Sequence, residues 1–220
     1  AVYERQEIHD ELVRLMVSTR EQQVFGLVGP AGSGKTEMAL TAAHYLMKHH
    51  SDYSVVRLEL GAHIDLEIIV NNLLVELRRN DLLHLDYASK RQRLKQLMQT
   101  PNLVLIIDEG YRPHLADEDT LKTILEVVAG ARVMLVARQL PDFEVYEVYL
   151  PGFDEEQVRR FLISRLEWLQ EFQANHFQEL THLTGGLPLM LNIMVSGLRN
   201  QRGRLPSLLE KLRVTEPTDR

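Results

Sequence analysis

The residue pattern with the clearest chemistry is a glycine-rich stretch that ends in a lysine and a threonine, directly after the apolar run 24–28. A loop that wraps around a β-phosphate turns its backbone N–H groups inward, and it needs glycine where a Cβ would collide. Lys35 can then reach the β- and γ-phosphates, Thr36 can give a hydroxyl to Mg²⁺, and the helix that follows points its positive end at the anion. We therefore predict a phosphate-binding loop for a nucleoside triphosphate, against the alternative of a glycine-rich turn that only caps a helix. The predicted nucleotide ligands are Gly29, Pro30, Ala31, Gly32, Ser33, Gly34, Lys35, Thr36 and Glu37.

Two adjacent carboxylates provide the second half of such a site. Asp108 and Glu109 follow the run 103–107, whose unbroken apolar character is typical of a central strand covered on both faces. Ligands of open α/β sheets bind at the carboxyl ends of such strands. We expect Asp108 to hold Mg²⁺, directly or through water, and Glu109 to be the general base for the attacking water. The alternative is a solvated acidic turn after a core strand.

A cation follows the next buried-type run, 132–137, where the chain continues into Arg138. A guanidinium in this place could reach the γ-phosphate, sense its presence and stabilise charge that develops during phosphoryl transfer. The alternative is a surface arginine in an ordinary loop.

The nine histidines form no cluster with metal-ligand spacing and there is no cysteine, so the only metal expected is Mg²⁺ carried by the nucleotide.

Composition limits the partners. The 220 residues carry a net charge of −6, which gives no overall attraction to nucleic acid or to an anionic membrane. The longest apolar runs are far shorter than a membrane span, and the charged N-terminus does not resemble a signal peptide. We therefore expect a soluble cytoplasmic chain, and the absence of cysteine agrees with a reducing compartment.

Strand-like and helical patterns alternate along the chain up to residue 151. This alternation predicts an α/β fold with a parallel sheet of about five strands flanked by helices. The expected strands are 24–28, 54–60, 103–107, 132–137 and 146–150, and the expected helices between them are 37–49, 66–79, 90–98 and 120–128.

The pattern changes after Pro151-Gly152, where only helical periodicity remains. We expect helices at 154–169, 174–183, 187–198 and 205–212, with Asp154 as the cap of the first. The chain thus divides into an N-terminal helical segment (1–20), a phosphate-loop α/β domain (21–151) and a small all-helical lid domain (152–220).

The segment Thr184-Gly185-Gly186-Leu187-Pro188-Leu189 resembles the Gly-Leu-Pro-Leu element of the STAND class of P-loop ATPases, which includes the NB-ARC, AP-ATPase and NACHT proteins. The resemblance implies that Pro188 lies against the nucleotide base and couples the lid to nucleotide state. The alternative is a plain Gly-Gly helix break with proline in the first turn. The segment that holds Tyr3 and Arg5 resembles the family's N-terminal segment, which packs near adenine, although Glu4 stands where the family usually has glycine.

The resemblance also bears on turnover and on the length of the protein. The Asp108-Glu109 pair is more similar to NACHT and AAA+ members than to many plant NB-ARC proteins, which favours hydrolysis. The sequence ends just after the lid, so we expect sensor and effector domains to belong to a longer chain.

We therefore predict a slowly hydrolysing ATP-dependent switch that controls lid position and homo-oligomer formation. ATP is preferred over GTP because the sequence contains no Asn-Lys-x-Asp signature. Three alternatives remain open at this point. They are an AAA+ loader or motor on DNA that recruits Arg159, Arg160 or Arg165, a small-molecule phosphotransferase, and a nucleotide-locked scaffold without turnover.

Overall fold

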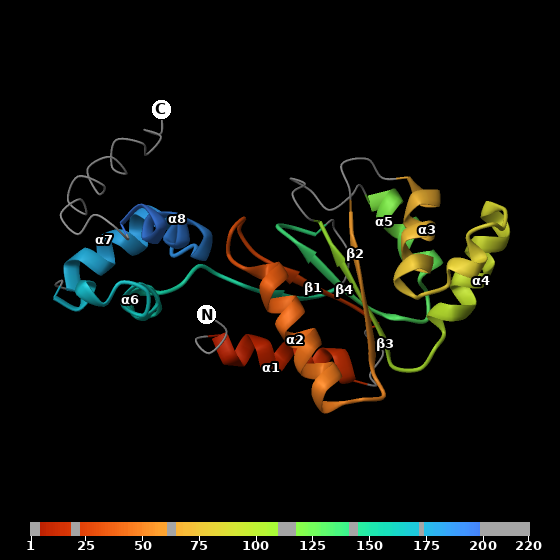
Figure 1. Ribbon diagram of the computed structural model, residues 1–220, viewed down its shortest axis with the longest axis horizontal. Helices are drawn as coiled ribbons and strands as arrows, with labels where there is room; N and C mark the ends of the chain where they lie inside the picture. The colour runs from red at the N-terminus through yellow and green to blue at the C-terminus, as the bar shows by residue number, and fades with distance from the viewer. Residues whose placement is uncertain are drawn as a thin grey trace.

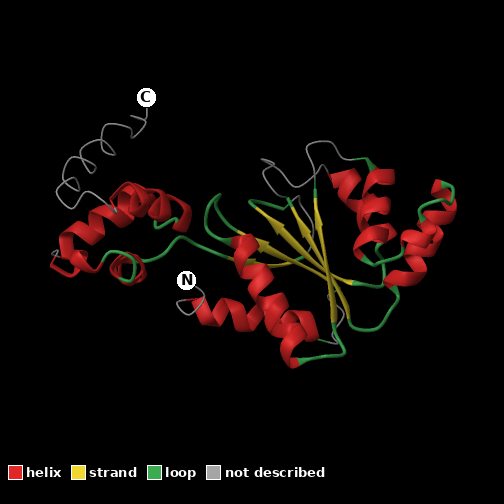
Figure 2. Ribbon diagram, in the orientation of Figure 1, coloured by secondary structure: helices red, strands yellow, loops and turns green. Residues whose placement is uncertain are grey.

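The computed structural model describes residues 5–18, 23–60, 65–109, 118–140, 145–171 and 174–198, so Tyr3 and the expected helix 205–212 lie outside the described residues. Five strands of this part of the chain form one sheet in the order β2-β3-β4-β1-β5, and every neighbouring pair is parallel. Figure 2 draws the sheet in yellow and the helices in red. The predicted α/β fold with a parallel sheet is confirmed. The strands are β1 (Val24–Val28), β2 (Ser54–Glu59), β3 (Leu103–Asp108), β4 (Arg132–Ala137) and β5 (Tyr146–Tyr149).

Helices cover both faces of this sheet (Figure 1). On one face a core forms beneath α1 and α2, and on the other a second core forms beneath α3, α4 and α5. Strand β3 supplies both cores alternately, with Val104 and Ile106 on the first face and Leu103, Leu105 and Ile107 on the second. This double burial explains why its sequence shows no polar alternation. The helices are α1 (Gln6–Val17), α2 (Lys35–His49), α3 (Leu66–Glu76), α4 (Tyr87–Met98) and α5 (Glu118–Val127), with a short 3₁₀ turn η2 (Asn80–Leu82).

Local hydrogen bonds determine the end of α3 and the start of α4, and both differ from the bounds expected from apolar periodicity. Helix α3 ends at Glu76 rather than 79 because Arg78 adopts φ 57° and Arg79 N–H returns to the Leu74 carbonyl. Helix α4 begins at Tyr87, three residues before the expected start, because the Asp86 carboxylate accepts a hydrogen bond from Ser89 N–H.

The helices that follow Pro151 share a hydrophobic core of their own and join the sheet through an extended link after β5 (Figure 1). We keep the name lid for this helical part, whose movement stays a prediction. Its elements are α6 (Glu155–Ile163), the 3₁₀ turn η3 (Glu167–Glu171), α7 (Ala174–Thr184) and α8 (Pro188–Leu198). Asp154 caps α6 in a capping box with Gln157, as predicted.

The expectation of one helix over 154–169 is wrong, because the structure divides it into α6 and η3. Leu166 and Leu169 continue the apolar spacing across the break and both pack into the lid core. Periodicity therefore does not reveal where the helix stops.

Candidate functional site

The glycine-rich loop lies between the end of β1 and the start of α2, as its sequence predicts. Gly34 is the N-cap of α2 with φ 93°, and Gly32 has φ 79°, a region that side chains with a Cβ rarely adopt. A Cβ on Gly32 would also lie 2.9 Å from the Leu189 Cβ. Both glycines are therefore required by conformation, and Gly32 is additionally required by contact with the lid.

Lys35 is buried at the N-terminus of α2 and is held by its own loop. Its Nζ donates hydrogen bonds to the carbonyl oxygens of Gly29 at 2.9 Å and Pro30 at 3.0 Å. Burial lowers the pKa of the amine, while the nearby carboxylates of Glu109 and Asp108 oppose that shift. The amine is thus placed between the loop and the carboxylate pair, where a phosphate would meet it.

The carboxylate pair emerges at the end of β3. Both side chains are buried, and Glu109 N–H donates to the Val136 carbonyl at 3.0 Å, which fixes its backbone against β4. One carboxylate oxygen of Glu109, Oε2, is buried without a hydrogen-bond partner among the described residues. Burial raises the pKa of Glu109 above its ordinary value, although the Arg138 backbone N–H and the Lys35 charge lower it in part. A carboxylate with a raised pKa and an unused oxygen suits proton transfer.

Arg138 begins the turn after β4, and its Nε lies 3.7 Å from Glu109 Oε1. Its side chain is 42% exposed, so the guanidinium faces solvent on one side and the buried carboxylate on the other. The structure brings Lys35, Asp108, Glu109 and Arg138 together at the carboxyl ends of β3 and β4 and the start of α2, and their assigned roles stay predictions.

Asp108 has a partner that the sequence analysis did not identify. Its Oδ2 accepts a hydrogen bond of 2.8 Å from Arg57 Nη2 on the neighbouring strand β2. The only local sign of this pair is an arginine within a β-branched run, and such a residue is usually read as a solvent-facing position.

A cavity of about 510 Å³ opens between the phosphate-binding loop and the lid. This volume lies within the range of small-molecule sites. Its lining includes most of the residues predicted to contact the nucleotide, from both sides. They are Arg5, Gly32, Ser33, Gly34, Thr36, Glu37 and Pro188, joined by Met38, Phe153, Phe161, Arg165, Leu189 and Asn192.

Arg5 links the three parts of the chain that meet at this cavity. Its guanidinium donates to the carbonyl oxygens of Ser33 at 2.6 Å and Pro151 at 2.5 Å. It also lies over the Phe153 ring, 4.3 Å from the ring centre. The predicted adenine contact by Arg5 stays a prediction, and Phe153 is a lining residue that the sequence analysis missed because no motif marks it.

The lid arginines considered for DNA binding have local partners. Arg159 and Arg160 pair with Glu156 on the exposed side of α6. Arg165 lies over the Phe161 ring at 4.2 Å, beside the cavity. These contacts agree with a solvated helix face for the first two residues and place only the third near the predicted nucleotide.

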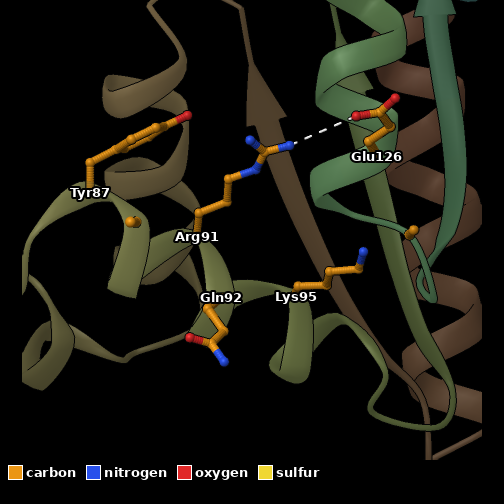
Figure 3. A pocket seen from close by; sticks show the side chains of 7 residues that line it. Tyr87, Arg91, Gln92, Lys95 and Glu126 are labelled. Atoms are coloured by element: carbon orange, nitrogen blue, oxygen red, sulfur yellow. Dashed lines mark ion pairs between the residues drawn. The ribbon is translucent and has the colours of Figure 1, made fainter.

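A second hollow of about 540 Å³ lies between α4 and α5 (Figure 3). Tyr87, Arg91, Gln92 and Lys95 line it from α4, and Arg91 forms a 3.8 Å ion pair with Glu126 of α5. None of its lining residues belongs to the phosphate-binding loop or the carboxylate pair. Its size alone does not indicate chemistry.

Among the described residues, no helix combines the length and the apolarity that crossing a bilayer requires.

Comparisons with known proteins agree with the geometry. A family model described as the NB-ARC domain matches residues 5–145, more than half of the chain. A probable disease resistance protein of Arabidopsis thaliana is 26% identical over 132 residues, which cover 58% of this chain and 14% of that protein's length.

Two solved structures share the fold. A Walker-type ATPase of Pyrococcus abyssi is 16% identical with a TM-score of 0.59, over 95% of this chain and 76% of that chain. A Signal Transduction ATPase with Numerous Domains from Pyrococcus horikoshii, which carries a tetratricopeptide repeat sensor, is 19% identical with a TM-score of 0.55. That match covers 84% of this chain and 29% of the other.

Proposed function

The chain belongs to the NB-ARC domain family of STAND-class P-loop ATPases, and from this premise we propose that it is the core of an ATP-driven molecular switch. ATP with Mg²⁺ binds in the cavity between the phosphate-binding loop and the lid. Slow hydrolysis then removes the γ-phosphate contacts and lets the lid rotate. The output is formation of a homo-oligomer or exposure of a surface for another protein.

The contact between Gly32 and Leu189 is the observation that carries this proposal. Leu189 N–H, in the first turn of α8, donates to the Gly32 carbonyl at 3.2 Å. A Cβ at Gly32 would already be too close to Leu189, so no flexible side chain separates the loop from the helix. A shift of the loop on nucleotide binding is therefore transmitted directly to the start of α8.

The chain between sheet and lid offers a short hinge for this rotation. Leu150 N–H donates to the Val28 carbonyl at 2.7 Å on the sheet side, and Phe153 N–H donates to the Gly186 carbonyl at 2.7 Å on the lid side. Only Pro151 and Gly152 lie between these two anchors. Because the proline ring fixes its own φ, rotation falls on the remaining dihedrals of these two residues.

The residues at the sheet edge fit a magnesium nucleotide. The Thr36 hydroxyl and the Asp108 carboxylate are oxygen donors of the kind that Mg²⁺ prefers, and Glu109 keeps one buried oxygen without a partner. Mg²⁺ would neutralise charge on the β- and γ-phosphates. Lys35 exchanges its two loop carbonyls for phosphate oxygens, and Glu109 accepts a proton from the attacking water.

Slow turnover follows from the position of Arg138, the cation nearest to Glu109 after β4. Arg138 is half exposed and faces Glu109 rather than an enclosed phosphate site, so full stabilisation of the transferred group needs a further cation from a neighbouring subunit. Hydrolysis is therefore coupled to oligomer formation.

A three-protein comparison tests the proposal. The native chain, Lys35→Ala and Glu109→Gln are titrated with ADP and ATP while phosphate release, oligomer mass and small-angle scattering are followed. We expect Lys35→Ala to lose nucleotide binding and Glu109→Gln to bind ATP without releasing phosphate.

Two outcomes would refute parts of the proposal. Retained micromolar affinity in Lys35→Ala would remove the loop assignment. Identical Trp168 emission and scattering with ADP and with a non-hydrolysable ATP analogue would remove the switch and leave a nucleotide-locked scaffold.

A further inference from the structure

Three charged side chains gather on one face of two adjacent strands, β2 and β3. Val56 and Leu58 of β2 pack into the core beneath α3 to α5, so Arg57 and Glu59 point to the opposite face. In β3, Val104 and Ile106 face the core beneath α1 and α2, and the alternation places Asp108 on that same face. The strand register pairs Glu59 with Asp108 directly.

The guanidinium of Arg57 joins the two carboxylates through one nitrogen. Its Nη2 lies 2.8 Å from Asp108 Oδ2 and 3.0 Å from Glu59 Oε2. The Asp108 side chain is 3% exposed, whereas the side chains of Arg57 and Glu59 are 35% and 48% exposed. The short distance and the burial of the acceptor make the contact with Asp108 a strong charge-assisted hydrogen bond, and the contact with Glu59 a weaker surface pair.

This arrangement gives Asp108 a cation before any metal arrives. A divalent ion coordinated by the Asp108 carboxylate would lie within a few ångströms of the positive charge of Arg57. The site is partly buried, so water screens this repulsion poorly. The Arg57 side chain can move away from Asp108, because it is one-third exposed and its Nη2 already contacts Glu59. The pair with Glu59 can persist when the pair with Asp108 is broken.

We propose that Arg57 is a built-in competitor of Mg²⁺ for Asp108, and that Glu59 holds the guanidinium when the metal displaces it. This rests on the proposed function, in which Asp108 holds the metal of a bound nucleotide. The consequence is that the resting protein binds nucleotide with weak dependence on Mg²⁺. The metal becomes tightly held only after Arg57 has moved to Glu59.

The test measures how strongly Mg²⁺ and nucleotide support each other's binding. The dissociation constant of a fluorescent ADP is determined without Mg²⁺ and at saturating Mg²⁺. The constant without Mg²⁺ divided by the constant with Mg²⁺ is the ratio that reports the coupling. Arg57→Gln removes the charge but keeps a hydrogen-bond donor for Asp108. We expect its ratio to rise about tenfold over the native chain, because a neutral amide donor competes with the metal for Asp108 more weakly than the charged guanidinium does.

Two further variants sharpen the result. Glu59→Gln removes the alternative partner from a pair on the exposed side of β2, so its ratio should fall below the native value by roughly two- to threefold. Arg79→Gln is the matched control, because Arg79 pairs with Asp81 at 2.8 Å on the surface with a similar exposure and lines no part of the nucleotide cavity. Its ratio should equal that of the native chain.

The outcomes separate this inference from the proposed function. A ratio for Arg57→Gln that is unchanged or lower would overturn the competition, and a ratio for Glu59→Gln that does not fall would do the same for the exchange. Asp108→Asn should abolish the dependence on Mg²⁺. If Asp108→Asn keeps the native ratio, Asp108 is not the metal site and the proposed function itself fails at that point. Thermal unfolding of each variant checks that it is folded, and Glu59→Gln keeps the inference testable if Arg57→Gln is not.

Discussion

Gly152→Ala should loosen the lid, although the substituted residue lies outside the phosphate-binding loop. An ideal Cβ on Gly152 would lie 2.0 Å from the Gly185 carbonyl oxygen and 3.1 Å from the Gly185 carbonyl carbon. Both neighbours are backbone atoms, so the linker and the turn 185–186 must move apart. The backbone of Gly152 does not have positive φ, so the effect is purely steric.

The cost follows from what the separation breaks. The hydrogen bond from Phe153 N–H to the Gly186 carbonyl, 2.7 Å long, is lost at about 1 kcal/mol. Phe153, which is 3% exposed in the lid core, is partly withdrawn at a further cost of about 2 kcal/mol. For a unit of about the lid's size that unfolds apart from the α/β part, a loss of about 3 kcal/mol lowers the unfolding temperature by roughly 12–24 °C.

Trp168 provides the assay because it packs against the lid core. Thermal unfolding followed by Trp168 emission should shift far more than unfolding followed by far-UV circular dichroism, which is dominated by the larger α/β part. Gly197→Ala, in helix α8, is the matched control in the same lid. A Cβ on Gly197 would have no neighbouring atom within 4 Å. This substitution should stabilise the lid by about 0.5–1 kcal/mol. A Trp168 midpoint for Gly152→Ala within about 1 °C of the native value would refute the steric argument.

Three further predictions concern the nucleotide site. Because burial raises the pKa of Glu109 from its ordinary 4.5, ionising this group costs stability as pH rises through the folded pKa. Glu109→Gln should therefore be more stable than the native chain in urea unfolding at pH 7, and the difference should vanish as pH falls below about 4.5; an equal difference at both pH values would contradict this. Arg5→Met removes the hydrogen bonds to Ser33 and Pro151 and should weaken ADP binding about tenfold, measured by calorimetry. Unchanged affinity would show that Arg5 does not contribute to nucleotide binding. Gly32→Ala should weaken nucleotide binding and also release α8, since its Cβ would press on Leu189, and a lid unaltered in Trp168 emission would argue against that contact.

The parts of the site that could be predicted from the sequence are those coded by adjacent residues. The loop from Gly29 to Thr36 needs its glycines and its lysine at fixed spacings, and the pair Asp108-Glu109 follows its strand directly. The alternating strand and helix patterns likewise predict a parallel sheet, because each pattern is local. Such features depend on covalent order, which the sequence displays.

Contacts that depend on strand register could not be predicted. The pairing of Arg57 with Asp108 requires knowing that β2 lies beside β3 and that residues 59 and 108 are in register. The approach of Gly152 to Gly185 depends on how the lid turn packs against the linker. Neither arrangement leaves a pattern within a window of neighbouring residues, and the break between α6 and η3 is hidden because apolar spacing continues across it.

In the proposed function, the position of β5 lets the lid act as a lever on the nucleotide. Among the described strands this edge strand pairs with β1 alone, the strand that runs into the phosphate-binding loop. Their ladder ends at the pair Val28–Tyr149, and just beyond it Leu150 N–H donates to the Val28 carbonyl. Torque applied to the lid from outside therefore reaches the loop as tension along one pair of strands, without crossing the rest of the sheet. A partner that pulls on the lid would thus change how fast ADP leaves, even if it touches no residue of the cavity.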